Sequence, residues 1–227
     1  MGKLIFVVGK TGSGKSYSMR NLDPKSTIIV NSDKKPFSDT TLVKNFTKEN
    51  QNCVVSNKLE KTMDILEAVH TQLLNVNVVI IDTWSRIMVD AVNAKDFRAT
   101  GGKNYLKKWG EMAQDNYDML DYVNNELRDD VHVYLMCHPE FYHDTYDEVE
   151  KQRAVVQGQA LKKMAPESFS SIVLYADILR EAVGVDFVFR TITNGLDTCK
   201  TPPNMFNGET IPNDLKEVDI AIRKYYQ

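Results

Sequence analysis

The sequence predicts an α/β protein with a mostly parallel central sheet, flanking helices and an antiparallel hairpin near the C-terminus. Three observations support this class. Strand-like segments alternate with segments of helical periodicity up to residue 138. The segment 76–82 contains an unbroken apolar run over residues 78–81 before its final Asp, as expected for a strand buried on both faces of a parallel sheet. Asn194-Gly195 follows a strand-like segment, which favours a tight antiparallel turn.

In the first part of the chain, apolar runs predict strands over residues 3–8, 27–31, 53–56, 76–82 and 131–137. A short helix is predicted over residues 14–21, because a glycine-rich loop precedes it and Asp23-Pro24 ends it. Apolar side chains recur every three or four residues over 58–74 and 106–127, which predicts two longer helices.

The character of the chain changes after residue 138. Residues 139–165 are polar, charged and poorly periodic. Strands are predicted over 172–178 and 185–193, with Asn194-Gly195 as the hairpin turn. The segment Pro212-Asn213-Asp214 is expected to cap a terminal helix that ends near Tyr225.

Length and composition suit one domain over residues 1–227, with a core at 1–180 and a C-terminal hairpin and helix at 181–227. No apolar run approaches the roughly 20 residues needed to cross a membrane, and no signal peptide is recognisable. Three widely spaced cysteines favour a reducing compartment, so we expect a cytoplasmic protein. The net charge is -3, so a nucleic acid would have to be held by local basic clusters.

A complete G-x-x-x-x-G-K-S motif follows the first strand and precedes the first predicted helix. It comprises Gly9, Lys10, Thr11, Gly12, Ser13, Gly14, Lys15 and Ser16, with Tyr17 directly after it. In a P-loop of this form, backbone N–H groups surround the phosphates of a nucleotide and the lysine contacts the β- and γ-phosphates. We therefore expect these nine residues to bind a nucleoside triphosphate, with Lys15 also acting in catalysis.

A magnesium ion is expected beside the nucleotide, because the Ser16 hydroxyl of such a motif is a metal ligand. A second carboxylate is needed at a neighbouring strand end, and Asp82 closes the apolar run Val78-Val79-Ile80-Ile81. We expect Ser16 and Asp82 to hold Mg²⁺. The cofactors predicted are thus ATP and Mg²⁺.

Hydrolysis requires a residue that orients or deprotonates the attacking water. Many P-loop ATPases carry a Glu directly after the strand-ending Asp, but Thr83 stands there in this chain. Asp33, after the second strand, is the candidate base, with a plain turn residue as the alternative. His138, at the end of the fifth strand, is a candidate sensor of the γ-phosphate or else a structural histidine.

These features together resemble the RecA-like P-loop ATPase fold. The P-loop, the segment Ile80-Ile81-Asp82-Thr83 and a later strand with a polar end are similar to those of small phage-encoded RecA-like ATPases that act as recombinases or single-strand annealing proteins. The resemblance extends from Lys3 to about Phe206. It implies a catalytic carboxylate after the second strand, where the family usually has Glu and this chain has Asp33.

The resemblance also implies self-assembly into a filament or ring. RecA places lysines that follow a β-hairpin into the ATP site of the neighbouring subunit. Lys200 matches that place, and Arg190 is a weaker match. An exposed structural lysine is the alternative for Lys200. A cation supplied in this way would make hydrolysis depend on assembly.

Two DNA-binding loops are implied by the same family, at residues 92–104 and 139–163. The cations expected to contact single-stranded DNA are Arg98, Lys103, Lys107, Lys108, Lys151, Arg153, Lys162 and Lys163. The second loop departs from this pattern, because its half from His143 to Glu150 is acidic.

The leading hypothesis is therefore an ATP-dependent DNA-binding ATPase of recombination or annealing, located in the bacterial cytoplasm if phage-encoded. A single-strand-binding protein is a candidate partner. A small-molecule kinase is an alternative, although the arginines form no lid-like cluster in the sequence. A nucleotide-dependent loader or adaptor for a replication protein is another alternative.

Overall fold

The computed structural model describes residues 3–94, 103–181 and 184–227. Its main sheet has eight strands in the order β10-β9-β8-β1-β5-β4-β2-β3. These strands are β1 (Lys3–Val8), β2 (Thr27–Asn31), β3 (Cys53–Val54), β4 (Val78–Asp82), β5 (His132–Cys137), β8 (Ile172–Glu181), β9 (Gly184–Arg190) and β10 (Thr210–Pro212).

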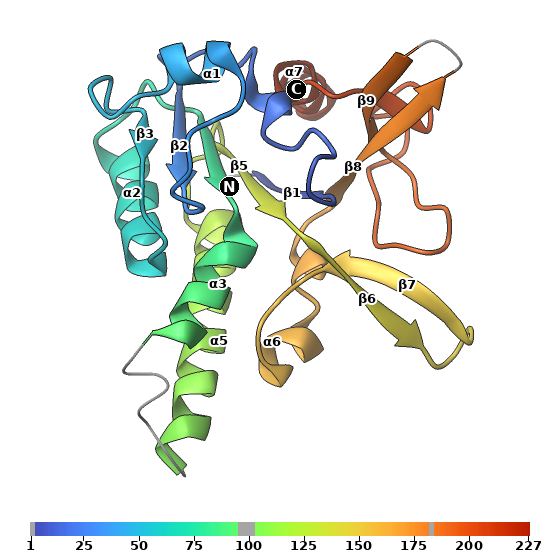
Figure 1. Cartoon of the computed structure of the whole chain (residues 1–227). Coiled ribbons are helices and arrows are strands. Elements are labelled where there is room, and N and C mark those ends of the chain that lie inside the picture. Colours follow the sequence, from blue (N-terminus) through green and yellow to red (C-terminus); the bar gives the residue numbers. More distant parts are fainter. Residues whose placement is uncertain (1–2, 95–102, 182–183) are drawn as a thin grey trace.

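The six strands from β3 to β8 in this order pair in parallel, and β9 and β10 add antiparallel strands at one edge. Helices lie on both sides of the sheet (Figure 1). They are α1 (Thr40–Asn45), α2 (Leu59–Thr71), α3 (Trp84–Asn93), α5 (Lys103–Asn125), α6 (Gln159–Met164) and α7 (Leu215–Tyr226). The predicted architecture is confirmed: an α/β fold with a mostly parallel sheet flanked by helices and a C-terminal antiparallel hairpin.

The alternation of side chains along β1 builds two hydrophobic cores. Leu4, Phe6 and Val8 face a core that includes residues of α2, α3 and α5. Ile5 and Val7 face the opposite core, to which α1 and α7 contribute. A strand that is buried on both faces in this way must be apolar at every position, which is the pattern that predicted it.

The helix predicted over residues 14–21 is wrong in extent, because only a 3-10 turn, η1 (Tyr17–Met19), forms there. The hydroxyl of Ser18 donates to the carbonyl oxygen of Lys15, a local bond of the kind that competes with regular helix. Pro24 follows within two turns and prevents extension.

The hairpin turn predicted at Asn194-Gly195 is also wrong. The antiparallel hairpin joins β8, which ends at Glu181, to β9, which begins at Gly184. Asn194-Gly195 lies in the loop after β9, where the side-chain oxygens of Thr193 and Asn194 accept hydrogen bonds from the N–H groups of Gly195 and Leu196. The local turn signal is satisfied there by side chains, without strand pairing.

Residues 139–165, which gave no periodic signal, contain regular structure. β6 (Pro139–Asp144) and β7 (Val149–Ala154) form a separate two-stranded antiparallel sheet, followed by α6. Figure 1 shows this β6–β7 hairpin projecting away from the main sheet. Most of its residues are exposed or half-buried, so neither face needs the apolar alternation by which a strand is recognised.

Candidate nucleotide site

The P-loop leaves the carboxyl end of β1 in a conformation that requires glycine. A Cβ at Gly9 would lie 2.5 Å from the Oγ of Ser13 and 2.8 Å from the carbonyl oxygen of Ala176. Gly12 and Gly14 have φ of +81° and +89°, in the left-handed region that favours glycine. The glycines of the motif therefore serve close packing and an unusual backbone path.

Lys15 is folded onto the loop that contains it. Its Nζ donates to the carbonyl oxygens of Gly9 at 2.5 Å and Lys10 at 3.0 Å, and the residue is 7% exposed. Burial lowers the pKa of Lys15, while the carboxylate of Asp82 acts in the opposite direction. The lysine must leave these carbonyls to contact a phosphate, which would replace them as its partner.

The structure brings Ser16 and Asp82 together. The Ser16 hydroxyl donates to Oδ2 of Asp82 at 2.9 Å across 66 positions of sequence. The sheet explains this contact: β5 lies between β1 and β4, and its parallel register places the carboxyl ends of all three strands at one edge.

These two residues fit a magnesium ion. A hydroxyl and a carboxylate oxygen are the hard ligands that Mg²⁺ prefers. Burial raises the pKa of Asp82, although the hydrogen bond from Ser16 opposes the shift. A divalent cation would stabilise the charged form of this buried carboxylate. Among the described residues no cluster of three His, Cys, Asp or Glu side chains forms another metal site.

A cavity of about 360 Å³ lies where β2, β4 and β5 end, and Asp33, Thr83 and His138 line it. The Asp33 carboxylate accepts a hydrogen bond from the Thr83 hydroxyl at 3.4 Å and forms an ion pair with Lys35 at 2.6 Å. The two residues predicted to act on the water and the γ-phosphate, Asp33 and His138, thus share one cavity.

His138 is held by its backbone, whose N–H donates to the Ser85 hydroxyl at 3.1 Å. Burial and the Lys15 ammonium lower the pKa of His138, and Asp33 raises it less. The imidazole is therefore neutral at pH 7 and can donate or accept one hydrogen bond in the cavity.

Sequence reasoning missed Lys35, Thr83 and Ser85 as parts of this site. Lys35 forms an ion pair with Oδ2 of Asp33, and the Thr83 hydroxyl donates to Oδ1 of the same carboxylate. The Ser85 hydroxyl accepts a hydrogen bond from the backbone N–H of His138. Each follows closely on a strand end. Because the carboxyl ends of parallel strands meet at one edge, every polar residue there was a candidate.

A family comparison identifies this arrangement. The AAA_24 family, described as an AAA domain, matches residues 1–203. The chain belongs to this AAA family. This AAA domain is a P-loop ATPase domain, and the match spans the P-loop, Asp82, Asp33 and His138.

Other comparisons add less. No curated protein matches this chain. Among solved structures, the KaiC-like protein from the archaeon Pyrococcus horikoshii OT3 is 12% identical, with 83% of this chain and 77% of that chain covered and a TM-score of 0.43. The flagellar accessory protein FlaH from Methanocaldococcus jannaschii is 10% identical, with 92% and 84% covered and a TM-score of 0.46.

Lys200 and Arg190 were predicted to enter the ATP site of a neighbouring subunit. Both lie outside the cavity that Asp33 lines in their own chain. Lys200 is exposed, and its backbone pairs with Val173 in β8. Arg190 forms ion pairs with Asp197 at 2.7 Å and Asp177 at 3.4 Å. A role of Lys200 in a neighbouring subunit stays a prediction.

The first group of predicted DNA contacts lies at the start of α5. Arg98 and the side chain of Lys103 are outside the described residues. Lys107 is exposed and forms an ion pair with Glu111 at 3.3 Å, whereas Lys108 is half-buried. This end of the helix therefore carries accessible positive charge.

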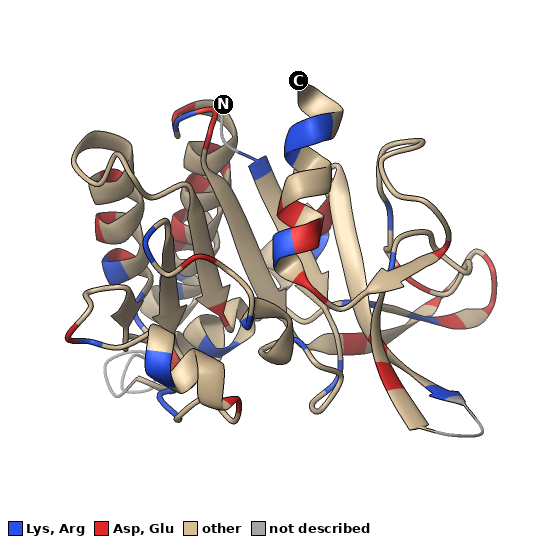
Figure 2. Ribbon diagram, turned by 90° about the horizontal axis from the view of Figure 1, so that it is seen from above, with Lys and Arg blue, Asp and Glu red and all other residues tan. Residues whose placement is uncertain are grey.

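The second group lies on the β6–β7 hairpin and α6, and most of its charge is balanced within the chain. Arg153 and Lys162 both bond Glu140, at 2.9 and 2.8 Å, and Lys151 pairs with acidic residues of the hairpin turn. Lys163 is exposed. Figure 2 shows basic and acidic residues interspersed over the ribbon. DNA contact by this group would require exchange of internal ion pairs.

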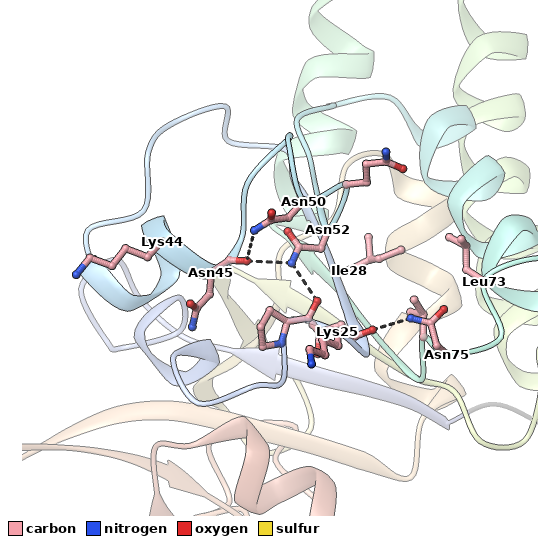
Figure 3. A pocket seen from close by; sticks show the side chains of 12 residues that line it. Lys25, Ile28, Lys44, Asn45, Asn50, Asn52, Leu73 and Asn75 are labelled. Carbon is pink, nitrogen blue, oxygen red and sulfur yellow. Dashed lines mark hydrogen bonds between the residues drawn. The ribbon is translucent and has the colours of Figure 1, made fainter.

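A further cavity, of about 710 Å³, is remote from the nucleotide site (Figure 3). It lies at the amino ends of β2 and β4, whereas the P-loop and Asp82 lie at the carboxyl ends. Two asparagines of this cavity bond the backbone of neighbouring loops. Asn52 Nδ2 donates to the carbonyl oxygens of Pro24 and Asn45, and Asn75 Nδ2 donates to that of Lys25 (Figure 3).

Proposed function

We propose that this P-loop ATPase domain binds and hydrolyses Mg-ATP and uses the cycle to act on single-stranded DNA in recombination or strand annealing. The observation that carries the ATPase part is the hydrogen bond between Ser16 and Asp82, because it unites the P-loop with a buried carboxylate. The DNA part rests on the resemblance to phage-encoded RecA-like proteins and on the charge at the start of α5.

The residues of the chain suggest how hydrolysis proceeds. P-loop amides and the Lys15 ammonium hold the β- and γ-phosphates, and Ser16 and Asp82 hold the magnesium ion. The ion, when bound, neutralises charge that develops on the phosphates. Asp33 orients the attacking water and accepts its proton, and Lys35 and Thr83 fix the carboxylate that does so. Neutral His138 donates a hydrogen bond toward the γ-phosphate.

Single-stranded DNA is the proposed partner of the α5 start and the β6–β7 hairpin. Phe141 is 55% exposed and Tyr146 is 94% exposed, so the hairpin presents aromatic rings on which bases can stack. Lys107 is exposed, and its ion pair with Glu111 lies on the surface where such pairs are weak, so the start of α5 provides the initial phosphate contacts through Lys107 and Lys108. The protein would act in the cytoplasm as a filament or ring, with a single-strand-binding protein as a candidate partner. None of the described helices is suited to spanning a membrane.

The ATPase rate and the particle size, each measured with and without single-stranded DNA, test this function. We expect DNA to raise both. DNA affinity should fall with salt by roughly 0.7 log unit per log unit of salt for each phosphate contacted. Unchanged rate and size with DNA would reject the DNA role, and phosphate transfer to a nucleoside would favour a kinase. ATP-dependent capture of a replication protein, without DNA stimulation, would favour a loader.

A further inference from the structure

Asn213, just before α7, has a buried side chain without a hydrogen-bond partner. It is 2% exposed, and neither Oδ1 nor Nδ2 is bonded within the described residues. Its backbone is fully used, since its N–H donates to the carbonyl oxygen of Phe187 at 3.2 Å and its carbonyl accepts from Arg20 at 2.7 Å. Buried carboxamides nearly always have partners. A ligand would supply the partners that the protein does not.

The position of this carboxamide points to the nucleotide. Asn213 Oδ1 lies 3.2 Å from the point where a Cβ on Gly14 would stand, and Cδ1 of Phe187 lies 2.8 Å from the same point. Gly14 directly precedes Lys15 in the P-loop. The amide and the ring therefore lie against the loop that holds the phosphates.

An aromatic surface adjoins the amide. The rings of Tyr17 and Phe187 have centroids 5.6 Å apart and are tilted by 47°. The Arg20 guanidinium lies 4.0 Å above the Tyr17 ring, which is 40% exposed. Aromatic rings beside a phosphate site suit the flat face of a nucleobase, which stacks on them.

We propose that Tyr17, Phe187 and Asn213 form the nucleobase subsite and that Asn213 selects adenine. This inference rests on the proposed function, since it concerns the base of the same nucleotide. A carboxamide presents one donor and one acceptor, which match the 6-amino group of adenine and an adjacent ring nitrogen. Guanine offers two acceptors on the corresponding edge, so its O6 would oppose Asn213 Oδ1. Because both amide atoms are covered, the aromatic pair must shift as the base enters.

Calorimetric binding without DNA tests the subsite, with Mg-ATP, Mg-GTP and the magnesium complex of purine riboside triphosphate, which lacks the 6-amino group. The wild type should bind ATP about tenfold more tightly than the other two. Asn213→Ala should lose this preference by weakening ATP alone. Phe187→Ala should weaken all three, because stacking does not depend on the base. Asn194→Ala, in an exposed loop, is the matched control and should behave as the wild type.

Asn213→Leu, which keeps the side-chain size but has neither donor nor acceptor, guards against a folding defect in Asn213→Ala, because the buried carboxamide has no hydrogen-bond partner to lose. It should show the same loss of preference with an unchanged melting temperature. Equal weakening of all three nucleotides by both variants would overturn the proposal. If the wild type binds all three equally, the subsite fails while the ATPase proposal stands. If it binds none, both fail.

Discussion

At the scale of single residues, Ser16 and Asp82 form the proposed magnesium site. Their side chains are bonded at 2.9 Å, and burial with a raised pKa leaves the Asp82 carboxylate in need of a cation. Asp33 differs from Asp82, because it already has partners in Lys35 and Thr83. These contacts would hold the Asp33 carboxylate in place for its proposed role on the attacking water.

Asp33→Ala should leave Mg-ATP binding close to normal and reduce hydrolysis by at least about 100-fold, the usual contribution of a general base. Lys15→Ala should instead abolish binding, because the lysine contacts the phosphates directly. Single-turnover rates and calorimetric affinities for both variants separate the two roles. Equal loss of binding in Asp33→Ala would show that Asp33 is structural.

At the scale of elements, α7 is attached to the sheet through a buried polar cluster. Asp219 of α7 lies 2.6 Å from Nδ1 of His132 and accepts hydrogen bonds from the Tyr134 hydroxyl at 3.1 Å and from Arg223 at 2.7 Å. Burial alone would raise the pKa of Asp219, but the bond to His132 and the pairing with Arg223 lower it overall. The charged carboxylate is thus stabilised in the folded state.

Asp219→Ala should lower the free energy of unfolding at pH 7 by about 3 kcal/mol, because it leaves a buried network unpaired. A folded-state pKa below the unfolded value gives stability that is complete above about pH 4 and is lost as pH falls through the folded pKa. The difference in the free energy of unfolding between wild type and variant, measured with urea, should therefore become smaller in acid. A difference in the free energy of unfolding that stays constant down to pH 2 would contradict this prediction.

The elements also show which sequence signals are reliable. The buried strands β1, β2, β4 and β5 and the helices α2, α5 and α7 lie close to their predicted ranges. Asp214 caps α7 by accepting from the N–H of Lys216, as expected. In contrast, α1, α3 and the β6–β7 hairpin were not predicted, because α1 is short, α3 follows directly on a buried strand, and the hairpin has no apolar face.

At the scale of the whole molecule, we predict that hydrolysis depends on assembly. Lys200 is exposed and lies outside the cavity that contains Asp33 and His138. Burial lowers the pKa of Lys200, and Glu167 opposes the shift. It is therefore available to a neighbouring subunit.

Lys200→Ala should reduce the ATPase rate of the assembled, DNA-bound state by at least about 100-fold, as removal of an arginine finger does. The basal rate of the unassembled protein should be unchanged. Rates measured at protein concentrations below and above assembly, with light scattering as the monitor, check this. An equal reduction in both states would mean that Lys200 acts within its own chain or is structural.

The sequence by itself determined the P-loop, the candidate role of Asp82 and the fold class, because glycine spacing and continuous apolar runs are local patterns with few structural solutions. Only the tertiary structure decided which strand ends meet, and hence that Asp33, Lys35, Thr83 and His138 share one cavity. It also placed Asn213 against Gly14, almost 200 positions earlier in the chain. No local pattern encodes such contacts, since they depend on strand order and register across the whole sheet.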